Sequence, residues 1–206
     1  MTTTRQRARR SILNRLLSTH LEPGDRLGLP VLARKLEMSV TPVREACTQL
    51  SYSGLIAYRP NQGFVVPELS VAEARVLYNT VVALETAAVT HRPPAGADLQ
   101  LLSRLNNAFA TATGAETRYR ADMAFHELLT AYYRETPVVR VLEDLKVRIY
   151  LYERRYLEAA DNVTASVQLH DSIIGALGRE DVDAALIALR RNWLNIDPIL
   201  AAAGLR

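Results

Sequence analysis

Residues 26–66 read RLGLPVLARKLEMSVTPVREACTQLSYSGLIAYRPNQGFVV. Two short segments of this stretch carry apolar residues at helical spacing. Pro30 and Pro42 each suit the first turn of a helix, where the missing N–H costs nothing. After Gly54, two short apolar runs flank residues 59–63, a pattern that predicts a β-hairpin. Two helices joined by a tight turn and followed by a hairpin are the elements of a winged helix-turn-helix, a DNA-reading device.

A further helix is expected before this stretch, over residues 4–19. Ile12 and Leu16 lie on one face of it, and the turn sequence at 22–25 ends it. The first domain is therefore expected to be a winged helix-turn-helix DNA-binding domain that covers residues 1–68.

The last helix of this domain, which begins near residue 40, is expected to read DNA. Its inward stripe consists of Val43, Ala46, Cys47 and Leu50. The N-terminal residues of such a helix approach base edges in the major groove. We expect Arg44 to contact a base or a phosphate, because a guanidinium can bind guanine O6 and N7 together. The hydroxyl groups of Ser39 and Thr41 suit phosphates.

The hairpin tip offers a cation, two amides and a flexible glycine. We expect contacts with the DNA backbone or the minor groove from Arg59, Asn61, Gln62 and Gly63. The alternative for Arg59 is a solvated position at a strand end.

Composition and charge agree with this reading. The chain has 206 residues, of which 49% are hydrophobic, and a net charge of +3. Residues 1–66 hold ten basic and four acidic residues, whereas the remainder has a net charge of −3. A positive first domain suits phosphates, although charge clusters are also common on solvated faces. One cysteine excludes an internal disulfide, and no apolar run is long enough to span a bilayer.

Residues 69–206 are expected to form a second, all-helical domain. Ser70 and Glu73 form a capping box that opens a first helix, which ends before the breaker at 91–96. The other helices are expected at 98–112, 116–135, 137–159, 163–177 and 181–203. The fold class is therefore mainly α, with an antiparallel bundle of about six helices behind the winged domain.

One group of polar residues in the expected bundle could bind a metal. Asp122 and His126 lie one helical turn apart on the same face. His170 and Asn192 lie at similar distances from the joint between the last two helices, so they can reach the same level. One carboxylate and two imidazoles suit zinc, nickel or manganese. The alternative is a solvated or hydrogen-bonded Asp–His pair.

The first domain resembles the DNA-binding domain of the GntR family of bacterial transcription regulators. The matching residues are Leu32-Ala33, Ser39, Thr41-Pro42-Val43-Arg44-Glu45-Ala46, Leu50, Gly54-Leu55, Gly63-Phe64 and Val66. The family usually has Arg or Lys where this chain has Val40. The resemblance therefore implies weaker phosphate binding here, or a different operator.

The second domain resembles the FadR-type C-terminal domain, called FCD. The matching residues are Tyr78, Leu84-Glu85, Asp122, His126, Leu142, Arg148, His170, Gly178, Asp181 and Ala184. The resemblance implies that Asp122, His126 and His170 are metal ligands, and that Asn192 replaces a last histidine. An amide oxygen is a weaker ligand than imidazole, so the site would bind metal less tightly or favour a harder ion.

The resemblance also implies a small-molecule effector, usually an organic acid. The arginine that often binds small carboxylates in the family corresponds to Val81 here, which makes a small polycarboxylate less favourable. We expect Tyr78, Arg148 and Tyr152 to line the effector pocket. For each tyrosine the alternative is a place in the core, and for Arg148 it is an ion pair with Glu85 or Glu143.

The sequence thus predicts a cytoplasmic, nucleoid-associated bacterial regulator rather than an enzyme. We expect a homodimer that binds double-stranded operator DNA under the control of a small molecule. Most proteins of this family are repressors, so repression is the expected effect. No membrane association is expected. One alternative is a metal-dependent hydrolase using Asp122, His126 and His170, but the sequence shows no obvious general base for it. Another is an architectural DNA-binding protein with no effector.

Overall fold

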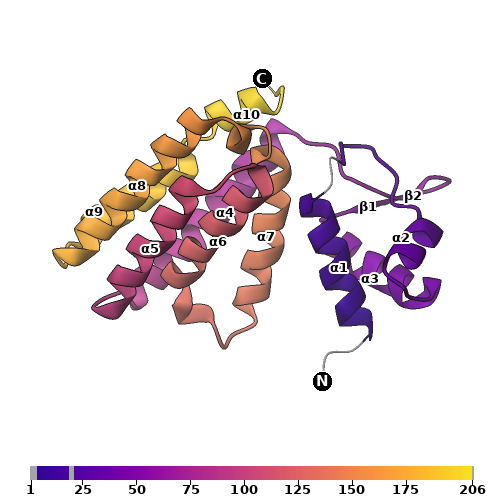
Figure 1. The fold of residues 1–206 in the computed structure, drawn as a ribbon, viewed down its shortest axis with the longest axis horizontal. Coiled ribbons are helices and arrows are strands. Elements are labelled where there is room, and N and C mark those ends of the chain that lie inside the picture. Colours follow the sequence, from indigo (N-terminus) through magenta and orange to yellow (C-terminus); the bar gives the residue numbers. More distant parts are fainter. Residues whose placement is uncertain (1–3, 19–20, 206) are drawn as a thin grey trace. The chain divides into compact units, whose positions relative to one another are not determined.

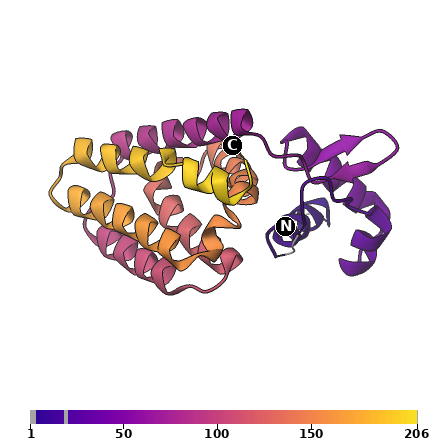
Figure 2. The ribbon, with the colours of Figure 1, turned by 90° about the horizontal axis from the view of Figure 1, so that it is seen from above.

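The computed structural model describes residues 4–18 and 21–205. The chain divides into two compact units, Met1–Leu69 and Ser70–Arg206 (Figures 1 and 2). Among the described residues, no helix is long and apolar enough to cross a membrane.

The first unit is a winged helix-turn-helix, as predicted. Its elements are the helices α1 (Thr4–Ser18), α2 (Leu29–Lys35) and α3 (Val40–Tyr52) and the strands β1 (Ala57–Arg59) and β2 (Gly63–Val65). Helix α1 packs against α3, and its buried Ile12 and Leu16 contribute to the core beside Val43 and Leu50 of α3. The expected end of the first helix, Thr19, lies outside the described residues.

The two strands form the wing. They pair antiparallel, with Tyr58 opposite Phe64. Two residues of the connecting turn have left-handed backbone conformations, Asn61 with φ of 63° and Gly63 with φ of 80°. Glycine and asparagine adopt this conformation at least cost, which explains why a tight hairpin forms here.

The second unit consists of helices with short connections. Its α-helices are α4 (Val71–His91), α5 (Ala97–Thr111), α6 (Ala115–Leu129), α7 (Val138–Glu153), α8 (Ala160–Gly178), α9 (Val182–Leu194) and α10 (Asp197–Ala202). Two short 3₁₀ helices, η1 (Ala131–Tyr133) and η2 (Tyr156–Glu158), follow α6 and α7. Helix α8 packs against α5 and α9, and α4 packs against α7 and α9. The predicted helical bundle is confirmed.

The end of the bundle differs from the prediction in one respect. The single helix expected over 181–203 is two helices, because the described chain leaves helical geometry at Asn195 and begins α10 at Asp197. Pro198 cannot donate a backbone hydrogen bond, so it suits the first turn of a new helix rather than the interior of a long one.

The capping box predicted at the start of α4 forms only in part, because the Glu73 side chain is bound by residues of α7. The Ser70 hydroxyl accepts a hydrogen bond from the Glu73 backbone N–H at 3.1 Å, as predicted. The Glu73 carboxylate, however, does not return to the Ser70 N–H. It binds Arg148 and Tyr152 of α7, and the Ser70 N–H donates instead to the Tyr152 hydroxyl at 3.1 Å.

Candidate functional site

Helix α3 presents its polar face to solvent. Ser39, Thr41 and Arg44 are exposed at its N-terminal end, while the opposite stripe is fully buried. Ser39 occupies the N-cap position, but its side chain makes no cap hydrogen bond. Its hydroxyl is therefore not used by the helix. Val40 is 38% exposed on the same end, where a cation would otherwise extend the positive surface.

The wing places the four other predicted DNA-contacting residues together. Arg59, Asn61 and Gln62 are exposed around the half-buried Gly63. Arg59 forms an ion pair with Glu68 at 3.6 Å, and both side chains are largely solvent-exposed. A solvated pair of this kind contributes little energy, so Arg59 remains able to exchange Glu68 for a phosphate.

The structure brings the three predicted metal ligands together inside the second unit. Asp122 and His126 come from α6 and His170 from α8, and one ligand atom of each lies within 4.8 Å of the others. The Asp122 Oδ1 atom is 3.4 Å from His170 Nε2 and 3.9 Å from His126 Nε2. Both histidines are buried, and Asp122 is 14% exposed.

Hydrogen bonds to the far side of each ring fix how the histidines are oriented. The Nδ1 atom of His126 is 2.8 Å from Glu85 Oε2, and that of His170 is 3.0 Å from Asn106 Oδ1. Since both partners are acceptors, each ring carries its proton on Nδ1 and directs the Nε2 lone pair toward Asp122. The buried Nε2 of His170 has no hydrogen-bond partner. The donor set thus fits a divalent cation such as zinc.

Glu85 is the centre of a buried charge network behind His126. Its carboxylate forms an ion pair with Lys146 Nζ at 2.6 Å and accepts a hydrogen bond from Trp193 Nε1 at 2.6 Å. Burial opposes the charged form, but His126 and Lys146 outweigh it and lower the pKa of Glu85 to about 2. Sequence reasoning gave Glu85 and Asn106 no role in the site. The available signs of Glu85 were an acidic residue within an apolar helix and its place among the residues that resemble the FCD domain.

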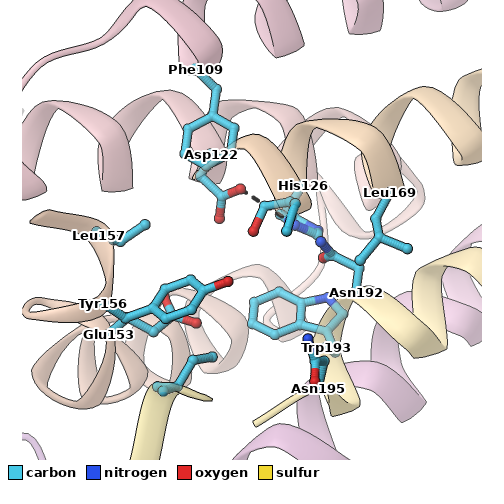
Figure 3. Close-up of a pocket in the computed structure, with 13 residues that line it drawn as sticks. Phe109, Asp122, His126, Glu153, Tyr156, Leu157, Leu169, Asn192, Trp193 and Asn195 are labelled. Atoms are coloured by element: carbon cyan, nitrogen blue, oxygen red, sulfur yellow. Dashed lines mark ion pairs between the residues drawn. The ribbon is translucent and has the colours of Figure 1, made fainter. Parts of the chain in front are cut away.

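A small cavity adjoins the cluster, with Asp122, His126, Glu153 and Asn192 in its lining (Figure 3). Its volume is about 30 Å³, enough for one or two water molecules. Burial, and then the nearby Asp122, raise the pKa of Glu153 to about 8. Burial also raises the pKa of Asp122. Both shifts mean that negative charge is unfavourable here without a cation.

The three residues predicted to line an effector pocket are not in the lining of this cavity. The Tyr78 hydroxyl donates a 2.9 Å hydrogen bond to Oε1 of Glu153, which does line the cavity. Arg148 pairs with Glu73 through a 2.9 Å bond from Nε and a 2.5 Å bond from the terminal nitrogen. Tyr152 donates to the same carboxylate. Arg148 and Tyr152 therefore hold the start of α4 against α7 and do not line the cavity.

Two protein-family models match this chain, one in the winged helix-turn-helix unit and one in the helical unit. Residues 4–66 match the model of the bacterial regulatory proteins of the gntR family, and residues 77–194 match the FCD domain. A transcriptional regulator of Agrobacterium vitis is 31% identical over 59% of this chain and 75% of its own length. The regulator McbR of Escherichia coli is 34% identical over 65% of each chain.

A third relative matches at greater length, and solved structures share the fold. The repressor RspR of Escherichia coli is 27% identical over 91% of this chain and 83% of its own. A solved structure of Escherichia coli McbR has a TM-score of 0.78, with 98% of each chain covered at 23% identity. These relatives are transcriptional regulators and not enzymes, which does not favour the metal-dependent hydrolase. The chain belongs to the GntR family of DNA-binding transcriptional regulators that carry an FCD domain.

Proposed function

We propose that the protein is a homodimeric, cytoplasmic repressor whose affinity for operator DNA is set by a small ligand and a divalent metal in its second unit. The observation that carries this proposal is the buried Asp122–His126–His170 cluster with an unsatisfied His170 Nε2. When bound, the cation would act as a Lewis acid that holds a ligand's donor atom. Asp122, His126 and His170 would bind it, with Asn192 beside them.

The first unit would read the operator. The N-terminal end of α3 would enter the major groove, with Arg44 on a guanine and the hydroxyls of Ser39 and Thr41 on phosphates. The wing residues Arg59, Asn61, Gln62 and Gly63 would contact the backbone or the minor groove. A ligand can alter this binding only by the difference in its own affinity for the DNA-bound and free states.

Footprinting tests the regulator against an architectural protein. We expect DNase I protection of a short, near-symmetric site on DNA fragments that the protein itself selects from a genomic library. The affinity for this site should change when Zn²⁺ is replaced by EDTA. Diffuse protection without a boundary would instead support the architectural alternative.

Metal binding should be measurable without DNA. Saturating the protein with Zn²⁺ at about 100 times its Kd should stabilise the fold by about 2.7 kcal/mol, seen as a higher melting temperature. Asp122→Asn keeps the shape of the side chain and removes a charged ligand, so most of this shift should disappear. Asp161→Asn, on the exposed first turn of α8, is the matched control. An equal shift in all three proteins would remove Asp122 from the site.

Dimer formation has a candidate surface on the second unit. Val76 of α4 and Ile187 and Leu194 of α9 are 65%, 60% and 44% exposed, and these two helices pack against each other. A contiguous exposed apolar patch is typical of an interface, and we propose that these three residues belong to one. We expect light scattering to give twice the chain mass of 22.9 kDa for the wild type and a shift toward the monomer for Ile187→Glu. Val141→Glu, at a 52% exposed residue of α7, should stay dimeric.

A further inference from the structure

The N-terminal end of α3 carries an exposed apolar side chain among polar ones. Val40 is the first residue of the helix and is 38% exposed. Over the residues that follow it, 41–49, the exposed side chains are all polar: Thr41, Arg44, Glu45 and Gln49. An isopropyl group gains nothing from contact with water, but it gains free energy when it is covered by another apolar group.

The other large apolar side chains that are exposed in the described part of the first unit lie elsewhere. Tyr58 of β1 packs edge-on against the ring of Phe64. Tyr52 lies at the opposite end of α3, and Val31 belongs to α2. Among these side chains, Val40 is the one that directly follows the N-cap residue of the helix expected to enter the major groove.

Val40 and Arg44 lie on the same side of α3. They are four positions apart, which places their side chains one turn apart on one face of the helix. The helix rises by about 6 Å between them, and successive base pairs are about 3.4 Å apart. With the N-terminal end of α3 in the major groove, the two side chains would therefore reach bases within about two base pairs of each other.

The chemistry of the major groove favours one partner for a valine. Guanine, cytosine and adenine present hydrogen-bonding groups there, whereas thymine also presents its C5 methyl group. The valine side chain has no donor or acceptor, so it would take a hydrogen-bonding edge away from water without replacing the lost bond. Against a thymine methyl group, the same contact covers two apolar surfaces at once.

We propose that Val40 is a specificity-determining residue that reads a thymine methyl group within about two base pairs of the guanine bound by Arg44. The inference rests on the proposed entry of α3 into the major groove, and it names one base of each operator half-site. Its energy comes from apolar contact, so it adds nothing to the salt dependence that phosphate contacts produce.

The test uses the purified protein and the duplex that the wild type selects from random sequence. Each thymine of one half-site is replaced in turn by deoxyuridine, which lacks only the methyl group. We expect one position to lower the wild-type affinity about fourfold, the effect of uncovering one methyl group. Val40→Ala should lose most of this response, because the methyl groups that cover the thymine are gone. Val141→Ala, at an exposed residue of α7, should keep it.

A second base analogue locates the guanine bound by Arg44. Replacing guanine by 7-deazaguanine removes the N7 acceptor, so the guanine bound by Arg44 is the one whose replacement weakens the wild type but not Arg44→Ala.

The two analogues separate the two proposals. If no guanine meets this criterion, the proposed reading by Arg44 fails, and the inference fails with it. If one does, but no thymine within about two base pairs of it shows a deoxyuridine loss, only the thymine contact is overturned. Equal deoxyuridine losses in the wild type and Val40→Ala would also overturn it alone. Alanine favours helix more than valine does, so Val40→Ala should melt no lower than the wild type.

Discussion

Replacing Arg44 with alanine is expected to weaken operator binding by about 100-fold or more, without loss of stability. A guanidinium that bonds guanine O6 and N7 contributes roughly 1–3 kcal/mol, and a dimer makes this contact twice. The side chain is exposed on α3, opposite the buried stripe, so its removal leaves no cavity. The measurement is fluorescence anisotropy with a duplex selected from random sequence by the wild-type protein.

Two comparisons show whether the loss is specific. Arg104→Ala, which removes an exposed arginine from α5 in the second unit, should leave the affinity unchanged. Binding of Arg44→Ala to an unrelated duplex at low salt should fall much less than binding to the selected one, since non-specific affinity depends on the total positive charge. Unaltered affinity for the selected duplex would remove Arg44 from the DNA-binding surface.

The winged unit could be predicted from sequence because its determinants are local. Two prolines at helix starts, the apolar stripe of α3 and a hairpin with Gly63 at a left-handed position each act over a few residues. The Asp122–His126 pair is local in the same way, since helical spacing alone places it on one face. Helical register could relate His170 only to Asn192, and its association with the Asp122–His126 pair as a set of ligands came from the resemblance to the FCD domain.

The parts that could not be predicted depend on contacts between distant segments. Glu85 and Lys146 are far apart in sequence, and only the packing of α4 against α7 makes them an ion pair. Asn106 reaches His170 from α5 in the same manner. Several glutamates were plausible partners for Arg148, and the packing of α4 against α7 brings Glu73 close to it.

The buried Glu85–Lys146 pair leads to the largest stability effect that we expect. Glu85→Gln should lower the free energy of unfolding by about 3–5 kcal/mol, because it leaves the buried ammonium group of Lys146 without a counter-charge. Both side chains are at most 5% exposed, so water cannot compensate. Urea denaturation in the absence of metal measures this loss. Glu127→Gln, an exposed position, should remain within about 0.5 kcal/mol of the wild type.

A second substitution and a pH series distinguish this electrostatic cause from simple loss of packing. Glu85→Gln combined with Lys146→Met removes both charges, and should recover part of the stability that the single variant loses. The pKa of Glu85 lies near 2 in the fold, below its ordinary value of 4.5. Its contribution is therefore complete above about pH 4.5 and is lost as the pH falls toward 2. Glu85→Gln should lack this part of the acid dependence, whereas an unchanged acid profile would show that the carboxylate is not ionised in the folded protein.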